Sequence, residues 1–289
     1  MNYFYPVIAA FLWGSNTIIT KLCANVLSPV EIGFYRWLVA ALILTPVVIK
    51  SIIIDYHVLK SCLPKLCVLG FLGGVVFQCL AYYAAHYTTA TNMGIIQSLM
   101  PIMALILSVA FLNSAVSVGG ILGVVVSAVG VVVVVSRGDF IVFVEHGINR
   151  GDLLMLVATL AFSFYGFYVH KWRLNVPLLQ SVYIQAVVAT IVLLPLFVVT
   201  PKNQISAESS FYIAFAGVAA SIFAPLLWMH GISKIGAARA SLFFNLVPVT
   251  TALLAVALLD EKMTVSVLVG GGLSILGVLI AEVFRPKSA

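Results

Sequence analysis

The stretch PIMALILSVAFLNSAVSVGGILGVVVSAVG at residues 101–130 decides the fold, because its pattern returns 147 residues later as PVTTALLAVALLDEKMTVSVLVGGGLSILG at residues 248–277. Each copy starts with a proline, runs through apolar residues to a short polar break, and ends in a glycine-containing apolar run. These ordered matches indicate an internal repeat. The identities at this offset include Pro101 and Pro248, Leu112 and Leu259, Gly123 and Gly270, Ser127 and Ser274, and Gly130 and Gly277.

The repeat extends toward the start of both copies, with an offset that drifts by a few residues as loops of unequal length would cause. Pro46 and Pro195 lie 149 residues apart, and Lys21 and Lys171 lie 150 residues apart. The chain is therefore predicted to consist of two homologous halves, at residues 1–137 and 150–285. Residues 138–149 would form the linker between them, and residues 286–289 a C-terminal tail.

The composition indicates that most of the chain lies in lipid. Hydrophobic residues make up 63% of the 289 residues, charged residues make up 8%, and the mean hydropathy is +1.17. A soluble domain carries about 25% charged residues, so this chain has too few charges to cover a surface in water. The same composition excludes a disordered chain, a collagen, a disulfide scaffold and a nucleic-acid-binding protein.

A helix that spans a bilayer needs about 20 mostly apolar residues, and ten such stretches fit this chain. Five helices per half is an odd number, so the second half enters the membrane in the opposite direction to the first. We therefore predict an all-α integral membrane protein with ten transmembrane helices, arranged as two inverted five-helix repeats. The longest polar interruptions are residues 51–65, 136–152 and 200–210. The expected spans are residues 3–20, 30–50, 66–86, 90–112, 116–136, 152–170, 180–200, 211–231, 236–259 and 264–284.

The net charge of +6 predicts an orientation, because basic residues collect in the cytoplasmic loops of membrane proteins. With ten spans both termini lie on one side, and nine basic residues share that side against five on the other. We expect a multi-pass protein of the cell inner membrane with both termini in the cytoplasm. The N-terminal apolar stretch lacks a basic start and an A-x-A site, so it is interpreted as the first membrane helix.

The sequence offers little for catalysis or metal binding. Its nine acidic residues lie in predicted loops or near helix ends, and no G-x-S-x-G, H-E-x-x-H or Walker-type motif occurs. The four cysteines form no C-x-x-C pair, and histidines near helix ends are interpreted as interfacial. We therefore expect no enzymatic activity, no metal and no cofactor. The cysteines are Cys23, Cys62, Cys67 and Cys79, and the histidines interpreted in this way are His86, His170 and His230.

Polar and aromatic side chains on six of the predicted helices suggest a binding cavity. An unpaired polar group in hydrocarbon costs several kcal/mol, so such groups either bond to another helix or line a cavity. Singly, each residue suits a hydrogen bond between helices. Together they favour a cavity for a small polar or amphipathic molecule, with aromatic rings for stacking and amides for hydrogen bonding. The predicted substrate-binding residues are Trp13, Asn16, Gln78, Tyr82, Asn92, Gln97, Tyr165, Trp228 and Asn245.

Pro101 and Pro248 lie at equivalent positions of the two halves and are predicted to kink the middle of their helices. A proline in a helix removes a backbone hydrogen bond and frees a carbonyl one turn upstream. Matched kinks would let each half bend and present backbone polarity to a cavity. Alternatively, the prolines only shape the packing of their helices.

Two other features leave alternatives open. The glycine-rich helices expected at residues 116–136 and 264–284 are interpreted as peripheral packing helices or as a dimer surface. Arg36 is the one cation well inside a predicted helix, and Glu31 precedes it by a little more than one turn. A structural ion pair or snorkelling to the interface competes with a role for Arg36 in anion recognition.

Three motifs resemble those of one transporter family. They are AAFLWGSNTIITK at residues 9–21, PVEIGFYRW at residues 29–37 and LDEKMTVSVLVGGGLSILGVLIAEV at residues 259–283. With the tandem five-helix halves, they resemble the drug/metabolite transporter superfamily, and within it the ten-helix branch built from two EamA-type repeats. The resemblance covers essentially the whole chain. It implies alternating access in the inner membrane around a central cavity lined by helices 1, 3, 4, 6, 8 and 9.

The sequence departs from the pattern of that superfamily at two places. The fourth helix of each repeat commonly ends in Gly-Glu before a short turn, and the second half keeps DEK at residues 260–262 whereas the first has NS at 113–114. The four-helix multidrug relatives use a glutamate in helix 1 to exchange protons against cations, but this helix 1 has WGSN at residues 13–16. The resemblance therefore disfavours antiport of cationic drugs by that mechanism.

From these observations we predict a secondary transporter or facilitator for a small polar or zwitterionic metabolite, with an amino acid as the favoured substrate. One half would rock against the other about the matched prolines. The lack of an acidic residue at mid-membrane favours facilitated diffusion or exchange over proton coupling. The expected partners are the small-molecule substrate and the lipid bilayer, without nucleic acid, and the protein would be a monomer or a homodimer. The alternatives are a carrier of a flat heteroaromatic compound, such as a vitamin or nucleoside derivative, and a membrane-embedded enzyme or scaffold.

Overall fold

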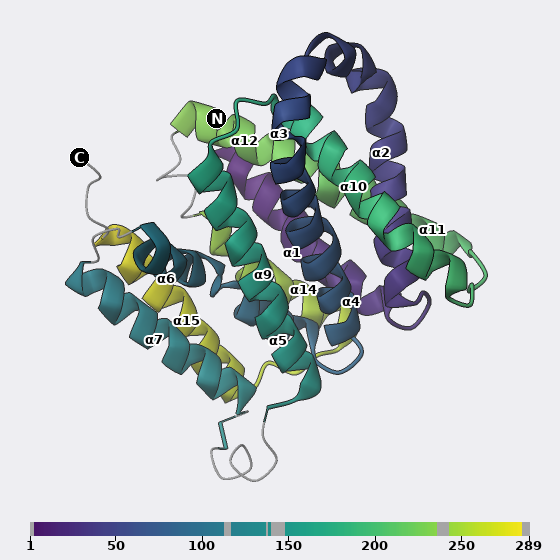
Figure 1. The fold of residues 1–289 in the computed structure, drawn as a ribbon. Helices are drawn as coiled ribbons and strands as arrows, with labels where there is room; N and C mark the ends of the chain where they lie inside the picture. The colour runs from purple at the N-terminus through teal and green to yellow at the C-terminus, as the bar shows by residue number, and fades with distance from the viewer. Residues whose placement is uncertain (1–2, 113–116, 137, 140–147, 236–242, 285–289) are drawn as a thin grey trace.

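The structure is a computed structural model that describes residues 3–112, 117–136, 138–139, 148–235 and 243–284, and these residues form helices and no strands (Figure 1). The all-α prediction is thereby confirmed. Most of the predicted linker, the C-terminal tail and the Asn113-Ser114 turn lie outside the described residues.

Each of the ten predicted ranges overlaps at least one described helix. Six helical stretches of the described residues are long and apolar enough to cross a membrane. Some spans are composed of consecutive segments that follow one another without a loop. In the first half the helices are α1 (Phe4–Cys23), α2 (Pro29–Ile54), α3 (Tyr56–Leu69), η1 (Gly70–Phe77), α4 (Gln78–Ala84), α5 (Ala90–Gln97), α6 (Met100–Leu112) and α7 (Val118–Val135). In the second half they are α9 (Arg150–Trp172), α10 (Leu178–Val199), α11 (Ala207–Ala214), η2 (Phe215–Phe223), α12 (Ala224–Ile235), α14 (Leu246–Leu259) and α15 (Val265–Val283).

The polar interruption expected at residues 51–65 is largely helical, which differs from the sequence interpretation. α2 continues to Ile54 and α3 begins at Tyr56, so only Asp55 separates them. Hydropathy identifies the part of a helix that suits hydrocarbon, and a helix can continue beyond that part into the polar region of the bilayer. Lys60 and Lys65 are exposed on α3, as that extension requires.

A π-helical segment occupies the same place in each half, and it reveals the repeat in three dimensions. η1 follows α3 in the first half and η2 follows α11 in the second, and both are bordered by α-helix. A Cβ atom on Gly70 of η1 would lie 3.0 Å from the carbonyl oxygen of Gln185 on α10. A Cβ atom on Gly217 of η2 would lie 2.9 Å from the carbonyl oxygen of Arg36 on α2. The same close contact therefore joins each π segment to the second helix of the other half.

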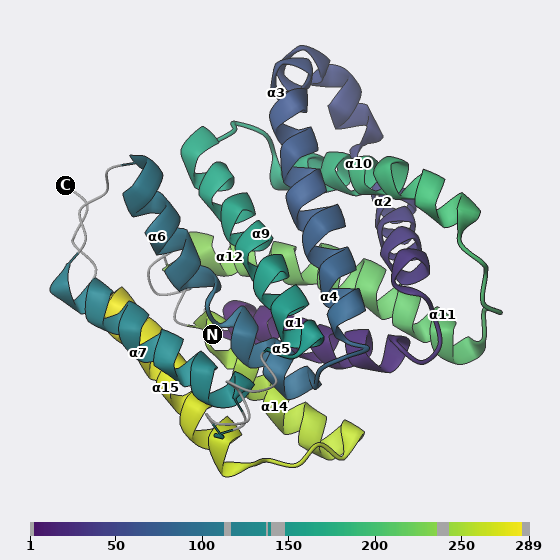
Figure 2. The same ribbon diagram turned by 60° about the horizontal axis from the view of Figure 1, so that its bottom comes forward.

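Helices of the first half pack against helices of the second. α2 packs against α10, and α7 packs against α15 (Figures 1 and 2). α1 of the first half contacts α12 and α14 of the second, while α9 of the second contacts α4 and α6 of the first. Each contact between halves thus has a counterpart in which the halves exchange roles, as two inverted repeats require.

The fourth span of each half, which is the fourth and the ninth of the whole chain, is interrupted just before the matched prolines. α5 ends at Gln97 and α6 begins at Met100, so Pro101 is the second residue of a new helix. Asn245 is the N-cap of α14, and Pro248 is the third residue of that helix. The expected mid-helix kinks are therefore breaks, with each proline in the first turn of the following helix. Proline is tolerated there because the first-turn N–H groups have no partner within the helix.

Glycines bring α7 and α15 into close contact along one edge of the bundle (Figure 2). Cβ atoms built on Gly123, Gly130, Gly270 or Gly277 would meet backbone atoms of the opposite helix at distances that real Cβ atoms do not show. Between these glycines Ser274 Oγ lies 3.2 Å from Ser127 Oγ. These two helices pack on each other, which accounts for their glycine patterns without a second copy of the chain.

We expect Gly277→Ala to destabilise the protein by about 1–3 kcal/mol, because the added methyl group would overpack a backbone contact that cannot shift. Gly272→Ala is the matched control, since a Cβ atom on Gly272 meets nothing within 4 Å. Thermal unfolding of the purified variants in detergent measures the difference. Equal unfolding temperatures for the two variants would contradict the packing described here.

Candidate functional site

Arg36 lies between the two halves and has four uncharged hydrogen-bond partners. Its Nε donates to Ser221 Oγ on η2 at 2.7 Å, and this bond crosses from one half to the other. Its Nη1 lies 3.1 Å from Gln78 Oε1, 3.3 Å from the Tyr82 hydroxyl and 3.4 Å from Asn16 Oδ1. The Arg36 side chain is only 3% exposed. Three of the predicted substrate-binding residues, Asn16, Gln78 and Tyr82, are therefore gathered around one buried guanidinium.

The expected pair of Arg36 with Glu31 does not form. The two residues are five positions apart on α2, which places them on different faces of an α-helix. Glu31 instead completes a capping box with Ser28 and accepts hydrogen bonds from the Asn203 backbone at 2.8 Å and from Asn203 Nδ2 at 2.7 Å. The structural ion pair that the sequence suggested is absent from the described residues.

An aromatic cluster adjoins the Arg36 site. The Trp13 ring centroid lies 5.5 Å from that of Trp228 and 5.6 Å from that of Phe244, and the Trp228 and Phe244 centroids lie 5.6 Å apart. Trp13 Nε1 donates to the backbone oxygen of Ala220 at 3.3 Å, next to the serine that binds Arg36. Rings from α1, α12 and the segment before α14 therefore meet where the halves touch.

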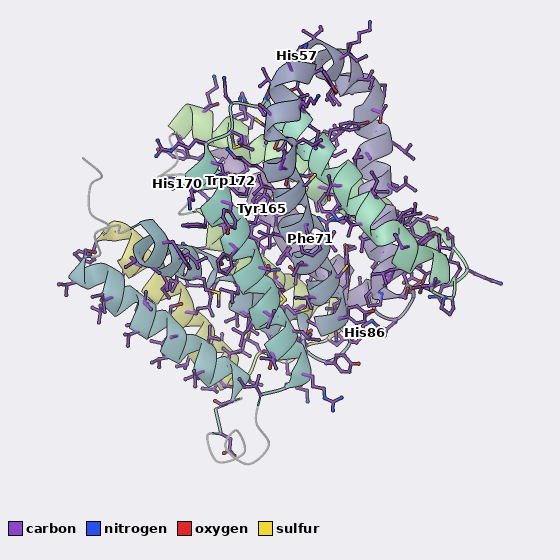
Figure 3. The ribbon with its side chains drawn as sticks, in the orientation of Figure 1. His57, Phe71, His86, Tyr165, His170 and Trp172 are labelled. Carbon is purple, nitrogen blue, oxygen red and sulfur yellow. The ribbon has the colours of Figure 1, made fainter. Side chains whose placement is uncertain are left out.

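Tyr165 lies on α9 and faces η1, apart from this aromatic cluster. Its ring stacks on Phe162 with centroids 5.0 Å apart, and a Cβ atom on Gly73 would lie 3.0 Å from it. Its hydroxyl group lies close to the Gln185 side chain. Figure 3 shows Tyr165 midway along α9. Because Gln185 is on α10, this contact lies within the second half.

The three remaining amides do not surround Arg36. Asn92 is in the first turn of α5, where Nδ2 donates to the Asp152 carboxylate at 3.3 Å and 3.4 Å, so a structural role accounts for it. Gln97 is half-buried at the end of α5, and no hydrogen bond joins its side chain to another described residue. Asn245 is buried at the break before α14, directly after Phe244 of the aromatic cluster.

A polar network links the two halves at the end of the bundle where α1 and α4 finish. The Glu261 carboxylate accepts hydrogen bonds from the Ala90 backbone at 2.7 Å, the Thr91 backbone at 3.1 Å and Thr91 Oγ1 at 2.6 Å. A carboxylate at a helix N-terminus is favourable because the free N–H groups and the helix dipole attract negative charge. Beside it, Lys21 Nζ donates to the backbone oxygens of Ala85 and Thr88.

The described histidines are exposed, and His57, His86 and His170 lie at or near helix ends (Figure 3). Partial burial lowers the pKa of the His86 imidazole, and the nearby Lys21 ammonium lowers it further. Among the described residues, no group of three or more His, Cys, Asp and Glu side chains is placed to hold a metal ion.

The sequence interpretation missed two parts of this site. Phe244 completes the aromatic cluster, but a phenylalanine in a membrane helix does not differ from its apolar neighbours in the sequence. Ser221 was noticeable as a polar residue in an apolar helix, yet its bond to Arg36 depends on which face η2 presents. The π-helical segment sets that face, and it has no distinctive sequence pattern.

We expect Glu261→Gln to weaken the network at the start of α5, because the neutral amide replaces a charge-assisted acceptor. Amide hydrogen exchange at residues 90–94 should become about tenfold faster, as the loss of one such bond predicts. Asp260→Asn is the control: Asp260 is exposed, and asparagine tolerates its positive φ of 52°. Unchanged exchange in Glu261→Gln would show that the carboxylate does not hold this end together.

Comparison with known proteins gives a consistent result over the whole chain. The EamA-like transporter family matches residues 1–136 and again residues 149–282. A protein of Bacillus subtilis named uncharacterized transporter YyaM is 28% identical over 273 residues, which cover 93% of this chain and 89% of its own length. An uncharacterized transporter of Archaeoglobus fulgidus is 26% identical over 272 residues, covering 93% of this chain and 94% of its own.

A protein of known crystal structure has the same fold. The two superpose with a TM-score of 0.67, covering 97% of this chain and 96% of that one, at 15% sequence identity. At this identity the likeness concerns the arrangement of helices alone.

Proposed function

Because this chain belongs to the EamA-like transporter family, we propose that it is a secondary transporter or facilitator for a small polar or zwitterionic metabolite, with amino acids as the first candidates. The observation that carries the proposal is the meeting of aromatic rings and uncharged hydrogen-bonding groups from both halves around Arg36. Trp13, Asn16, Gln78 and Tyr82 come from the first half, and Trp228 comes from the second.

This combination of groups suits a zwitterion of low molecular weight. Amide oxygens and hydroxyls can bind an ammonium group, N–H donors can bind a carboxylate, and rings can cover an apolar side chain. Such a site fixes orientation with a few polar groups while the remaining contacts are apolar. Gln97 and Asn245 lie near the two helix breaks, so they are kept as candidates for contacts that form during the cycle. Asn92 is left out because Asp152 uses its amide.

The proposed mechanism is alternating access, in which one half rocks against the other. The breaks before α6 and before α14 occur at equivalent places, so each half can bend there without the loss of a complete helical hydrogen-bond ladder. Pro101 and Pro248 keep these breaks in place because neither has an N–H group with which to extend the preceding helix.

The proposed setting is the cell inner membrane with both termini in the cytoplasm, which rests on the distribution of basic residues in the sequence. The described acidic residues lie at or near helix ends, and the described histidines are exposed. This arrangement favours facilitated diffusion or exchange over transport that is coupled to protons through a buried carboxylate.

A second candidate substrate class is the flat heteroaromatic compounds, such as vitamins or nucleoside derivatives. The observation that favours it is the aromatic cluster, because three rings within 6 Å of one another offer faces for stacking. Competition between aromatic heterocycles and aliphatic amino acids for the same uptake distinguishes the two classes.

The test of the proposed function is uptake into proteoliposomes by the purified full-length protein. The labelled panel would contain neutral amino acids, nucleosides and flavin-like vitamins, with and without a pH gradient. We expect saturable uptake of amino acids that is faster when the same compound is trapped inside, and recovery of the compound chemically unchanged. No uptake by folded protein would refute the proposal, and a chemically altered compound would indicate an enzyme.

Replacement of the cluster tryptophans should impair this uptake. For Trp13→Leu and Trp228→Leu we expect kcat/KM to fall about 5- to 50-fold, because each loses a stacking surface that leucine does not replace. Trp172→Leu serves as the control, since Trp172 stacks on Tyr168 at the end of α9 and is not one of the three rings of the cluster. If all three variants behaved alike, the aromatic cluster would have no part in recognition.

A further inference from the structure

Arg36 is a buried cation whose charge has no partner of opposite sign in the part of the chain that the structure describes. Its hydrogen-bond acceptors are a serine hydroxyl, a tyrosine hydroxyl and two side-chain amides, all of them neutral. The nearby carboxylate on its own helix, Glu31, is occupied by Ser28 and Asn203. Burying an unpaired charge in such surroundings costs free energy, so a buried arginine without an anionic partner indicates a functional role.

The internal repeat shows that the fold does not need this charge. Pro46 on α2 corresponds to Pro195 on α10 at an offset of 149 residues, and the same offset takes Arg36 to Gln185. The structure supports this equivalence, because the backbone oxygens of Arg36 and Gln185 each lie against a glycine of the opposite π-helical segment, Gly217 and Gly70. The same packing position therefore holds a cation in one half and a neutral amide in the other.

The hydrogen bonds of Arg36 use only part of its donor capacity. A guanidinium has five N–H groups in a fork that matches a carboxylate. The described acceptors lie around Nε and Nη1, and no described acceptor is bonded to Nη2. The Trp37 ring, 5.3 Å from Arg36 Cζ, stabilises the cation from its face without occupying these donors.

We propose that Arg36 binds the carboxylate group of the transported metabolite. This inference rests on the proposed function and narrows it to substrates that carry a carboxylate. Asn16, Gln78 and Tyr82 hold the guanidinium from the side of the first half, so it stays in place when the halves move apart. The bond from Arg36 Nε to Ser221 Oγ is the one that such a movement breaks.

Breaking that bond couples binding to movement. When η2 moves away from α2, Nε loses Ser221 and presents a donor next to the free Nη2, and a carboxylate can accept from both atoms. The substrate then supplies the negative charge that the empty site lacks, and the open state is stabilised only when a carboxylate is present. Ser221 returns to Nε after the substrate leaves.

The first part of the test changes the ligand and leaves the protein as it is. Uptake of labelled neutral amino acids into proteoliposomes would be competed with the same amino acids, with their carboxamides and with the corresponding decarboxylated amines. We expect the carboxamides and amines to compete more than about tenfold less well, because a site that pairs with a group discriminates strongly against analogues that lack it. Equal competition by all three would overturn the proposal without reference to any variant.

The second part changes the protein at Arg36. Arg36→Gln introduces the residue that occupies the equivalent position of the other half, so the packing around it is one that the fold already accommodates. We expect Arg36→Gln to lose amino-acid uptake more than about tenfold while competition by the carboxamides changes little. Arg36→Lys should be intermediate, since it keeps the charge but not the fork. Arg150→Gln, an exposed arginine at the start of α9, is the control and should transport normally.

The outcomes separate this proposal from the proposed function. If the wild-type protein transports none of the panel, the proposed function itself fails. If it transports amino acids but folded Arg36→Gln keeps the preference for the carboxylate over the carboxamide, transport stands and the role of Arg36 is refuted. If it transports nucleosides or vitamins that lack a carboxylate, carboxylate recognition is also refuted. If Arg36→Gln does not fold, the competition by ligand analogues of the wild-type protein decides.

Discussion

Hydrocarbon around a helix offers no hydrogen bonds, so each polar group of a membrane protein has to find its partner within the protein. This constraint accounts for the hydrogen bonds around Arg36. The guanidinium of Arg36 on α2 donates hydrogen bonds to the Gln78 side chain on α4 and to the Ser221 hydroxyl on η2. Three helical segments thereby pair their polar groups with one another. The same constraint holds the halves together, because parting α2 from η2 leaves a buried donor and a buried acceptor without partners.

The two halves have the same shape but different charges. Glycines at equivalent positions let η1 approach α10 and let η2 approach α2, and the glycines of α7 and α15 lie in one symmetric contact. Shape is therefore duplicated by the repeat. Charge is not, because Arg36 corresponds to Gln185 in the other half. A carrier needs symmetric packing to present equal openings to both sides, but one site for one substrate needs its distinguishing group only once.

The repeat and the hydropathy of the chain were sufficient to predict an all-helical membrane protein of two related halves. Helix ends were less predictable, since residues 51–65 are polar enough to resemble a loop yet continue α2 and α3. The structure brings Trp13, Asn16, Gln78, Tyr82 and Trp228 together as polar and aromatic neighbours, and their role in substrate binding stays a prediction. Asn92 lies apart from them, because its amide bonds to Asp152 through a contact between helices far apart in the sequence. Phe244 was missed because an apolar ring carries no signal in an apolar helix.

The two halves also differ in sequence at the position of Glu261, and this difference bears on the proposed movement. At the end where α1 and α4 finish, Glu261 of the second half caps α5 of the first with three hydrogen bonds. In the sequence, the residue of the first half that corresponds to Glu261 at the offset of 147 residues is Ser114, which has no carboxylate. Opening this end would separate the Glu261 carboxylate from the N–H groups at the start of α5. Water can form new hydrogen bonds to the carboxylate and to these N–H groups only after the two have separated. In the proposed alternating-access cycle, opening this end would cost these hydrogen bonds, and binding energy at the centre is what could offset that cost.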